Sequence, residues 1–320
     1  MKKVIILMLI VIFVAAIGMF CYVKFSLPNV GAAPEMTVEL TPDRIRRGEY
    51  LANHVAACMD CHSTRDWGRF SGPLQAGTLG KGGEYFGPEM GFPGKFYSKN
   101  LTPAQLKDWA DGEIFRAITS GVNKKGEALF PVMPYPYYAQ MDKEDILDII
   151  AYIRSLPVVE NDVPRSEADF PMNMIINTLP IKPSFTTKPP RENKVAYGKY
   201  LVTTAACIDC HSPVNKGRII AEKAFSGGRE FELPGGIVRS ANITPDTATG
   251  IGSWTNSTFI ARFQAYRHPE SMPAVSPGNY NTLMPWSMYA GMETADLEAI
   301  YTYLHSLNPV ENAVVKYTKK

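Results

Sequence analysis

The sequence CMDCH occupies residues 58–62, and the closely similar sequence CIDCH occupies residues 207–211. Each places two cysteines three positions apart, about one helical turn, and a histidine directly after the second cysteine. This arrangement lets two thiols bond one porphyrin while the adjacent histidine ligates its iron. The sequence therefore predicts two covalently attached haem c groups. The predicted attachment residues are Cys58, Cys61, Cys207 and Cys210.

The axial iron ligands are predicted from the same two motifs and from the sequence that follows them. His62 and His211 are the predicted proximal ligands. Met133 and Met284 lie 71 and 73 residues further on, each is followed by proline, and the two occupy aligned positions. This matched spacing favours the two methionines as distal ligands. A histidine and a methionine together leave no open position on the iron, which favours electron transfer over peroxide binding.

Other potential donors fit this pattern less well. A zinc site would need four ligands gathered tetrahedrally, and each motif offers only three. The other histidines and methionines considered have no equivalent in the other half or lie at the edge of a predicted helix. We expect packing or surface roles for His54, His268, His305, Met141, Met272 and Met292.

The two motifs belong to an internal duplication. Residues 133–161 align without a gap on residues 284–312. Upstream matches occur in the same order in both halves: residues 48–51 with 198–201, 70–72 with 225–227, and 100–103 with 242–245. This order predicts two copies of one domain, at residues 41–162 and 191–317.

The segment between the predicted domains, residues 163–190, contains six prolines. Proline at this density disfavours helices and central strands, so an extended connector is predicted. Its apolar residues suggest that it lies against the domains.

Helix signals predict a mainly α fold with little sheet. Thr41 before Pro42 is a plausible N-cap, and Asp142 with Asp145 resembles a capping arrangement. The isoleucines that follow Asp145 recur at helical spacing until Pro157, and residues 294–307 repeat the theme. The glycine-rich middle of each unit predicts loops with a small hairpin, around Gly82, Gly83 and Phe86 and around Gly227, Gly228 and Phe231.

The N-terminus contains an uncharged apolar run over residues 4–23, long enough as a helix to cross a bilayer core of about 30 Å. Lys2 and Lys3 precede it, which predicts a cytoplasmic N-terminus and an external remainder. We expect a single-pass anchor at residues 1–25 in a bacterial inner membrane, a linker at 26–40, and periplasmic haem domains. A cleaved signal peptide is the alternative, and a lipoprotein built on Cys21 fits less well.

Taken together, the sequence resembles the haem domains in the cytochrome c subunits of membrane-bound alcohol, gluconate and sorbitol dehydrogenases. The segments that carry the resemblance are residues 48–51, 98–103, 111–117 and 129–135, with their second-half counterparts. The resemblance implies cytochrome c-like domains, with a separate polypeptide as the catalytic subunit. Those subunits commonly have three haem domains, whereas this sequence has two.

The predicted function is electron transfer in a periplasmic respiratory chain. The donor would be a quinol-oxidising complex or a dehydrogenase, and the acceptor a downstream cytochrome or terminal oxidase. Two alternatives remain open: a dihaem enzyme such as a peroxidase or thiosulfate-type oxidoreductase, and a subunit whose haems only complete the fold. With a net charge of +2 and dispersed basic residues, nucleic-acid binding is not expected.

Overall fold

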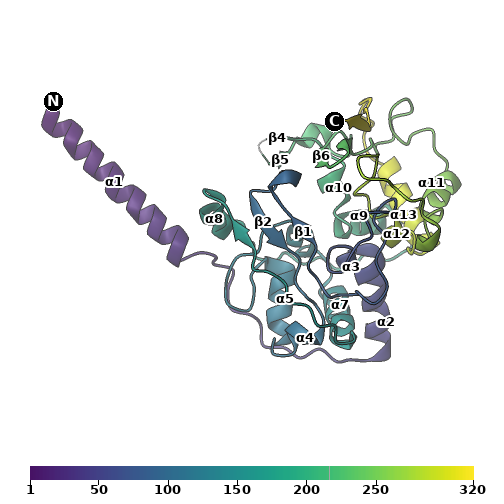
Figure 1. The fold of residues 1–320 in the computed structure, drawn as a ribbon, viewed down its shortest axis with the longest axis horizontal. Helices are drawn as coiled ribbons and strands as arrows, with labels where there is room; N and C mark the ends of the chain where they lie inside the picture. The colour runs from purple at the N-terminus through teal and green to yellow at the C-terminus, as the bar shows by residue number, and fades with distance from the viewer. Residues whose placement is uncertain (216) are drawn as a thin grey trace.

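The computed structural model describes residues 1–215 and 217–320. Helix α1, Lys2–Phe25, projects from the remainder of the protein as a single rod (Figure 1). None of its residues is buried. Among the described residues it is the one helix long and apolar enough to cross a membrane. Its C-terminal end touches the body of the protein where Asn177 donates a hydrogen bond to the carbonyl of Val23.

The first half begins with α2, Pro42–Tyr50, which continues into the π-helical turn η1, Leu51–Val55. The Thr41 side chain accepts a hydrogen bond from the Arg44 amide, so the predicted N-cap is confirmed. The other helical elements of this half are α3 Cys58–Cys61, η2 Pro88–Met90, α4 Pro103–Leu106, α5 Asp111–Ser120, α6 Tyr135–Tyr138 and α7 Lys143–Ser155.

Helix α7 has Asp142 as its N-cap, with the carboxylate accepting from the Glu144 amide. The helix ends before Pro157, as predicted. Asp145 does not cap the helix. Its carboxylate is fully buried and accepts a 2.6 Å hydrogen bond from the hydroxyl of Tyr200 in the second half.

The second half repeats the same order of helices, at the upper right of Figure 1. Its helical elements are α9 Lys194–Thr204, α10 Cys207–Cys210, η4 Ala221–Lys223, α11 Asn256–Gln264, η5 Pro269–Ser271, α12 Trp286–Tyr289 and α13 Thr294–His305. Buried apolar side chains of both halves form one cluster, in which Leu51 and Ile150 of the first half join Leu201 and Leu297 of the second.

In each half the first and last helices cross at a glycine. A Cβ atom added at Gly48 in α2 would overlap the carbonyl oxygen of Asp148 in α7. A Cβ atom at Gly198 in α9 would likewise overlap the carbonyl of Ala299 in α13. The missing side chain is what lets the two backbones approach this closely. The cysteine motif follows the first helix of each crossing pair closely in sequence.

Small antiparallel sheets flank the helices. In the first half β1 (Tyr85–Phe86) pairs with β2 (Gly94–Tyr97), which pairs with β3 (Glu167–Ala168). In the second, β6 (Glu230–Leu233) pairs with β7 (Gly236–Arg239), which pairs with β8 (Tyr317–Lys319). The hairpins predicted in the two glycine-rich regions are therefore present. A two-stranded ribbon is formed by β4 Val214–Asn215 and β5 Arg218–Ile219.

The proline-rich segment is not extended throughout. It contributes β3 to the first sheet and contains α8, Met172–Ile175, followed by the 3-10 turn η3, Ile176–Thr178. Pro171 precedes α8 and Pro180 follows η3, and proline is compatible with both flanks of a short helix. The prolines therefore bound a helical turn here, where the sequence analysis expected extended chain.

One correspondence between the halves is corrected by the structure. The Gly82 amide donates to the His62 carbonyl (2.9 Å), and the Gly227 amide donates to the His211 carbonyl (2.8 Å). Residues 225–227 are thus equivalent to residues 80–82, and the predicted match of 225–227 with 70–72 is wrong. The letters Phe-Ser-Gly recur in both places, but the first half has four more residues between its histidine and this glycine. Residues 65–72 therefore lie in a longer loop of the first half.

Candidate haem sites

The two cysteines of each motif begin and end a single helical turn, α3 or α10, and the histidine is its C-cap. The residue before each turn is left-handed, with φ of 49° at Ala57 and 50° at Ala206. An alanine in this conformation costs about 1 kcal/mol, and it reverses the chain immediately before the first cysteine. The two halves adopt the same local backbone, so two equivalent sites are built.

None of the four motif cysteines is paired in a disulfide. Burial raises the pKa of Cys58 and Cys207 to about 12 and that of Cys210 to about 11. It also raises the pKa of Cys61. No cluster of three or more His, Cys, Asp or Glu residues suited to a metal ion occurs in the part of the chain described. Paired neutral thiols one turn apart suit two thioether bonds to one haem.

Both predicted proximal histidines, His62 and His211, are held through Nδ1. The Nδ1 of His62 lies 2.7 Å from the carbonyl oxygen of Lys99, and that of His211 lies 2.8 Å from the carbonyl oxygen of Ala241. Because a carbonyl can only accept, Nδ1 carries the proton and Nε2 keeps the lone pair that a metal needs. Burial lowers the pKa of both imidazoles, so both are neutral at neutral pH. The residues present therefore fit a proximal iron ligand in each half.

The two accepting carbonyls are themselves fixed by the asparagine that follows each of them. Asn100 donates to the Val159 carbonyl (2.8 Å), and Asn242 donates to the Val310 carbonyl (2.8 Å). Each asparagine oxygen also accepts from the amide and hydroxyl of the threonine two residues later. This function of the asparagines does not follow from the residue types alone. The repeated Asn-x-Thr-Pro motif was the available signal.

The two predicted distal methionines lie just before α6 and α12 and pack against the core while remaining half-buried. Five residues after each methionine, a tyrosine hydroxyl donates to the carbonyl two residues before the cysteine motif. These bonds join Tyr138 to Ala56 (2.9 Å) and Tyr289 to Ala205 (3.0 Å). They fasten each methionine segment to its own cysteine motif.

The two motifs also lie near one another. Burial raises the pKa of Tyr289 well above its ordinary value, and Cys207 and Cys210 of its own half raise it further. Asp60 and Cys61 of the other half act on it in the same direction. The Tyr289 hydroxyl, at the end of α12, therefore lies near both motifs.

Tyr135, two residues after Met133, is fully buried, and its hydroxyl has no hydrogen-bond partner within the described residues. An unpaired buried hydroxyl is costly unless a bound group satisfies it. Haem carries carboxylate oxygens that can accept from such a donor. This orphaned hydroxyl is a further feature that fits a haem in the first half.

The remaining candidate donors have other roles. His54 contacts the Met288 carbonyl through Nδ1 at 2.8 Å, His268 is exposed beside Glu270, and the ring of His305 lies 4.0 Å from that of Tyr301. Met141, Met272 and Met292 are buried in the protein interior. These positions agree with the expected packing and surface roles.

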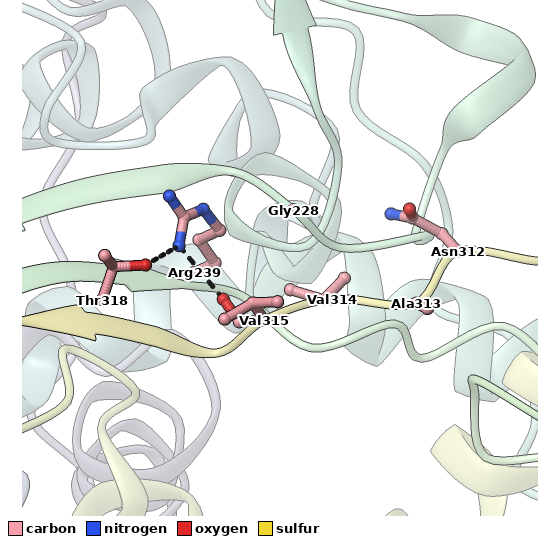
Figure 2. Close-up of a pocket in the computed structure, with 7 residues that line it drawn as sticks. All are labelled: Gly228, Arg239, Asn312, Ala313, Val314, Val315 and Thr318. Atoms are coloured by element: carbon pink, nitrogen blue, oxygen red, sulfur yellow. Dashed lines mark hydrogen bonds between the residues drawn. The ribbon is translucent and has the colours of Figure 1, made fainter.

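Two shallow hollows occupy equivalent places in the halves, and neither is lined by a cysteine motif. The first, of about 380 Å³, lies among Gly228, Arg239 and Asn312 (Figure 2). Arg239 there donates to Thr318 and to the Val315 carbonyl, so its guanidinium is occupied in holding β7 to the C-terminal segment. The second, of about 320 Å³, is lined by Gly83 and Asn161 of the first half. Each hollow lies beside the equivalent glycine of its half, Gly228 or Gly83.

Residues 195–308 match the family model for cytochrome c. The chain is 30% identical, over 93% of its own length, to the cytochrome c subunit of a quinone-dependent alcohol dehydrogenase from Gluconacetobacter polyoxogenes. It covers 63% of that relative, so it spans less than two thirds of its length.

Two further relatives have similar names. The cytochrome subunit of fructose dehydrogenase from Gluconobacter japonicus is 28% identical over 87% of this chain and 56% of its own. A protein named diheme cytochrome c-type from Cereibacter sphaeroides is 27% identical over 68% of this chain and 72% of its own. The protein thus contains a cytochrome c domain and is related to the cytochrome c subunits of dehydrogenases.

Proposed function

We propose that the protein is a membrane-anchored dihaem cytochrome c that carries electrons from a dehydrogenase or quinol-oxidising complex to a downstream cytochrome or terminal oxidase. The observation that carries the proposal is the equivalent construction around His62 and His211, each with Nδ1 bonded to a backbone carbonyl and each directly following a pair of cysteines that form no disulfide. Haem, when bound, supplies an iron that accepts and releases one electron.

In this proposal each half holds one haem through its own side chains. Cys58 and Cys61 attach the first, with His62 and Met133 as axial ligands. The second is held by Cys207, Cys210, His211 and Met284. The histidines present Nε2, and their Nδ1 bonds keep the rings oriented. The methionines close the other axial position, so neither iron is left open for substrate.

The names of the relatives support a dehydrogenase as the electron donor, because several are cytochrome subunits of dehydrogenases. Helix α1 supports the anchor, since all of its apolar side chains are outside the folded body. Beside its end lies α8, and Phe170 before α8 is 82% exposed. We place α1 in the bacterial inner membrane and the two halves in the periplasm.

Haem content tests the two sites directly. The chain is expressed in a host that matures c-type cytochromes, and intact mass and the pyridine haemochrome spectrum give the haems per chain. We expect two. Replacing Cys58 and Cys61 together by alanine should remove one haem, and replacing Cys207 and Cys210 should remove the other. Cys21→Ala is the matched control, because Cys21 lies in α1, and it should keep both.

The function is tested with the purified holoprotein reconstituted in membranes with a candidate dehydrogenase. Reduction of both haems on addition of that enzyme's substrate, and their reoxidation by a soluble cytochrome, is expected. A high-spin haem in the oxidised protein, together with turnover of hydrogen peroxide, would instead establish the dihaem enzyme. Chains that carry no covalent haem would exclude both.

A further inference from the structure

Residues 65–72, the longer loop of the first half, leave their own half and lie along the segment that leads to Met284. The Phe70 amide donates to the Pro273 carbonyl (2.9 Å), and the Val275 amide donates to the Gly68 carbonyl (2.8 Å). Residues 68–70 and 273–275 thus donate backbone hydrogen bonds to each other in both directions across the boundary between the halves.

Ser71 makes the contact closest to Met284. Its hydroxyl donates to the Met284 carbonyl at 2.6 Å and lies 3.1 Å from the Trp286 amide, which can donate to it. Its own amide donates to the Asn281 side chain at 2.8 Å. Ser71 is fully buried, so water does not compete for these bonds. One side chain of the first half therefore fixes the backbone on both sides of Pro285.

Asn281 completes the contact from the other side. Its amide nitrogen donates to the carbonyl of Arg69 (3.1 Å) and of Trp67 (3.3 Å), while its oxygen accepts from Ser71 and from the Thr282 amide. All of its hydrogen-bonding capacity is thus used on or beside the loop. Removing the Asn281 side chain would leave the amides of Ser71 and Thr282 without this acceptor. Removing the Ser71 hydroxyl would take one of two donors from the Met284 carbonyl, which also accepts from the Trp286 amide at 2.8 Å.

The other end of the loop is fastened to the first cysteine motif. Arg65 donates to Asp60 at 2.9 Å, to the Ser71 carbonyl at 2.7 Å and to the Gly72 carbonyl at 3.0 Å. Asp60 lies between Cys58 and Cys61, and both Arg65 and Asp60 are buried. The rigid fork of the guanidinium suits three such acceptors at once. A buried chain of contacts therefore runs from the first motif through Arg65 and Ser71 to Met284.

The second half lacks this arrangement. Asp209, the equivalent of Asp60, pairs with Arg229 at 3.3 Å, and Arg229 also donates to the Asp209 carbonyl. In the part of the chain that the structure describes, no hydrogen bond joins the second half to the backbone of Met133. A contact in the reverse direction is longer and does not involve the methionine itself: the hydroxyl of Tyr137, four residues after Met133, donates to the Asp209 carboxylate at 3.4 Å.

We propose that residues 65–72 form a clamp that positions Met284, with Ser71 as the positioning residue and Arg65 as its link to the first cysteine motif. The proposal rests on the proposed function, in which Met284 is a distal iron ligand. Through the clamp the first half holds the second haem's methionine in place. The two sites, otherwise built alike, then differ in how firmly their distal ligands are held.

The test uses Ser71→Gly in the full dihaem protein. Ser71 has φ of 65°, so glycine accepts the backbone and only the hydroxyl is lost. The weak methionine-to-iron absorption band at the red end of the oxidised spectrum is followed in two backgrounds. In Met133→Leu the remaining band belongs to the second haem, and in Met284→Leu to the first.

In the Met133→Leu background, Ser71→Gly should weaken the band and let added imidazole displace the methionine about fivefold more readily, as expected for one lost hydrogen bond. In the Met284→Leu background it should change neither. Ser166→Ala is the matched control, since that hydroxyl bonds the Tyr97 backbone and touches neither methionine segment. Asn281→Ala, made from the opposite side, should reproduce the effect of Ser71→Gly.

An unchanged band and an unchanged imidazole affinity in the Met133→Leu background would overturn the clamp and leave the proposed function standing. A Met284→Leu protein that keeps both bands would show that Met284 is not a ligand. That result would overturn the clamp and the proposed coordination together.

Discussion

The Tyr50 hydroxyl donates a 2.7 Å hydrogen bond to the buried carboxylate of Asp296, although the two residues are 246 positions apart. The equivalent pair is formed in the reverse direction, from Tyr200 to Asp145 at 2.6 Å. Each hydroxyl also lies near the amide at the start of the opposite final helix, Tyr50 at Glu293 and Tyr200 at Asp142. The halves are therefore joined by two copies of one contact, related as if by a two-fold axis.

Removing one of these hydroxyls should weaken the whole protein. Tyr50→Phe leaves a buried carboxylate and a helix N-terminal amide without their shared partner, and we expect a loss of about 2 kcal/mol in the free energy of unfolding. Tyr200→Phe should behave alike. Tyr301→Phe is the control: its hydroxyl bonds a backbone carbonyl within the second half, so a smaller loss is expected. Urea unfolding followed by circular dichroism measures all three, and equal losses would contradict a special role for the interface.

The same pair of contacts predicts how stability depends on alkaline pH. Burial, and secondarily the charges of Asp296 and Asp145, raise the pKa of Tyr50 and Tyr200 above that of an unfolded tyrosine. The unfolded chain then loses these protons at about pH 10, before the folded chain does. Stability is therefore full below about pH 10 and falls as pH rises above it. The double Tyr→Phe variant should lose stability less steeply between pH 9 and 11, and an unchanged slope would count against this assignment.

Local patterns in the sequence predicted those features that depend on residues near one another. The Thr41 cap, the α7 isoleucines and the spacing of each cysteine motif all concern neighbours within about one or two turns. Asp145 was misinterpreted for the same reason. Its spacing from Asp142 resembles a capping arrangement, whereas its partner Tyr200 lies in the other half.

The features that the sequence did not reveal depend on backbone atoms or on tertiary contacts. His62 and His211 contact the backbone carbonyls of Lys99 and Ala241. Every residue has such a carbonyl, so residue types do not reveal which one accepts. Ser71 was matched with Ser226 because Phe-Ser-Gly occurs at both residues 70–72 and residues 225–227. Only the hydrogen bonds of Gly82 and Gly227 reveal which loops correspond. The tandem domain boundaries and the ligand assignments remain predictions.

The crossing glycines should tolerate no side chain. In Gly48→Ala or Gly198→Ala the new methyl would overlap a backbone carbonyl that a helix holds in place, so the helices must separate. We expect a loss of about 3 kcal/mol in unfolding free energy, despite the better helix propensity of alanine. Gly68→Ala is the control, because its nearest neighbour is the movable end of the Asp66 side chain. The melting temperature of each variant measures the effect, and equal melting temperatures for all three would contradict the prediction.

Helix α1 should be dispensable for folding. None of its residues is buried, so deleting residues 1–25 removes little of the packed interior. If the deleted chain is exported by a separate signal peptide, we expect two haems per chain and an unchanged melting temperature. It should then be recovered in the soluble periplasmic fraction, whereas the full chain should sediment with membranes. If the protein is expressed with residues 1–25 but recovered without them, these residues would instead be a cleaved signal.

If His62 and His211 ligate two haems as proposed, the asparagines behind them should tune the two haems separately. Asn242→Ala releases the segment whose Ala241 carbonyl accepts from His211, and a weaker Nδ1 bond makes the imidazole a poorer electron donor to iron. We expect the reduction potential of the second haem to rise while the first stays unchanged. Asn100→Ala should raise the reduction potential of the first haem and leave the second unchanged, because the Lys99 carbonyl accepts from His62. Each variant is therefore the control for the other in a potentiometric titration of the purified protein. If either variant moved both potentials equally, the effect would come from general loosening of the fold, and the separate tuning of the two histidines would be wrong.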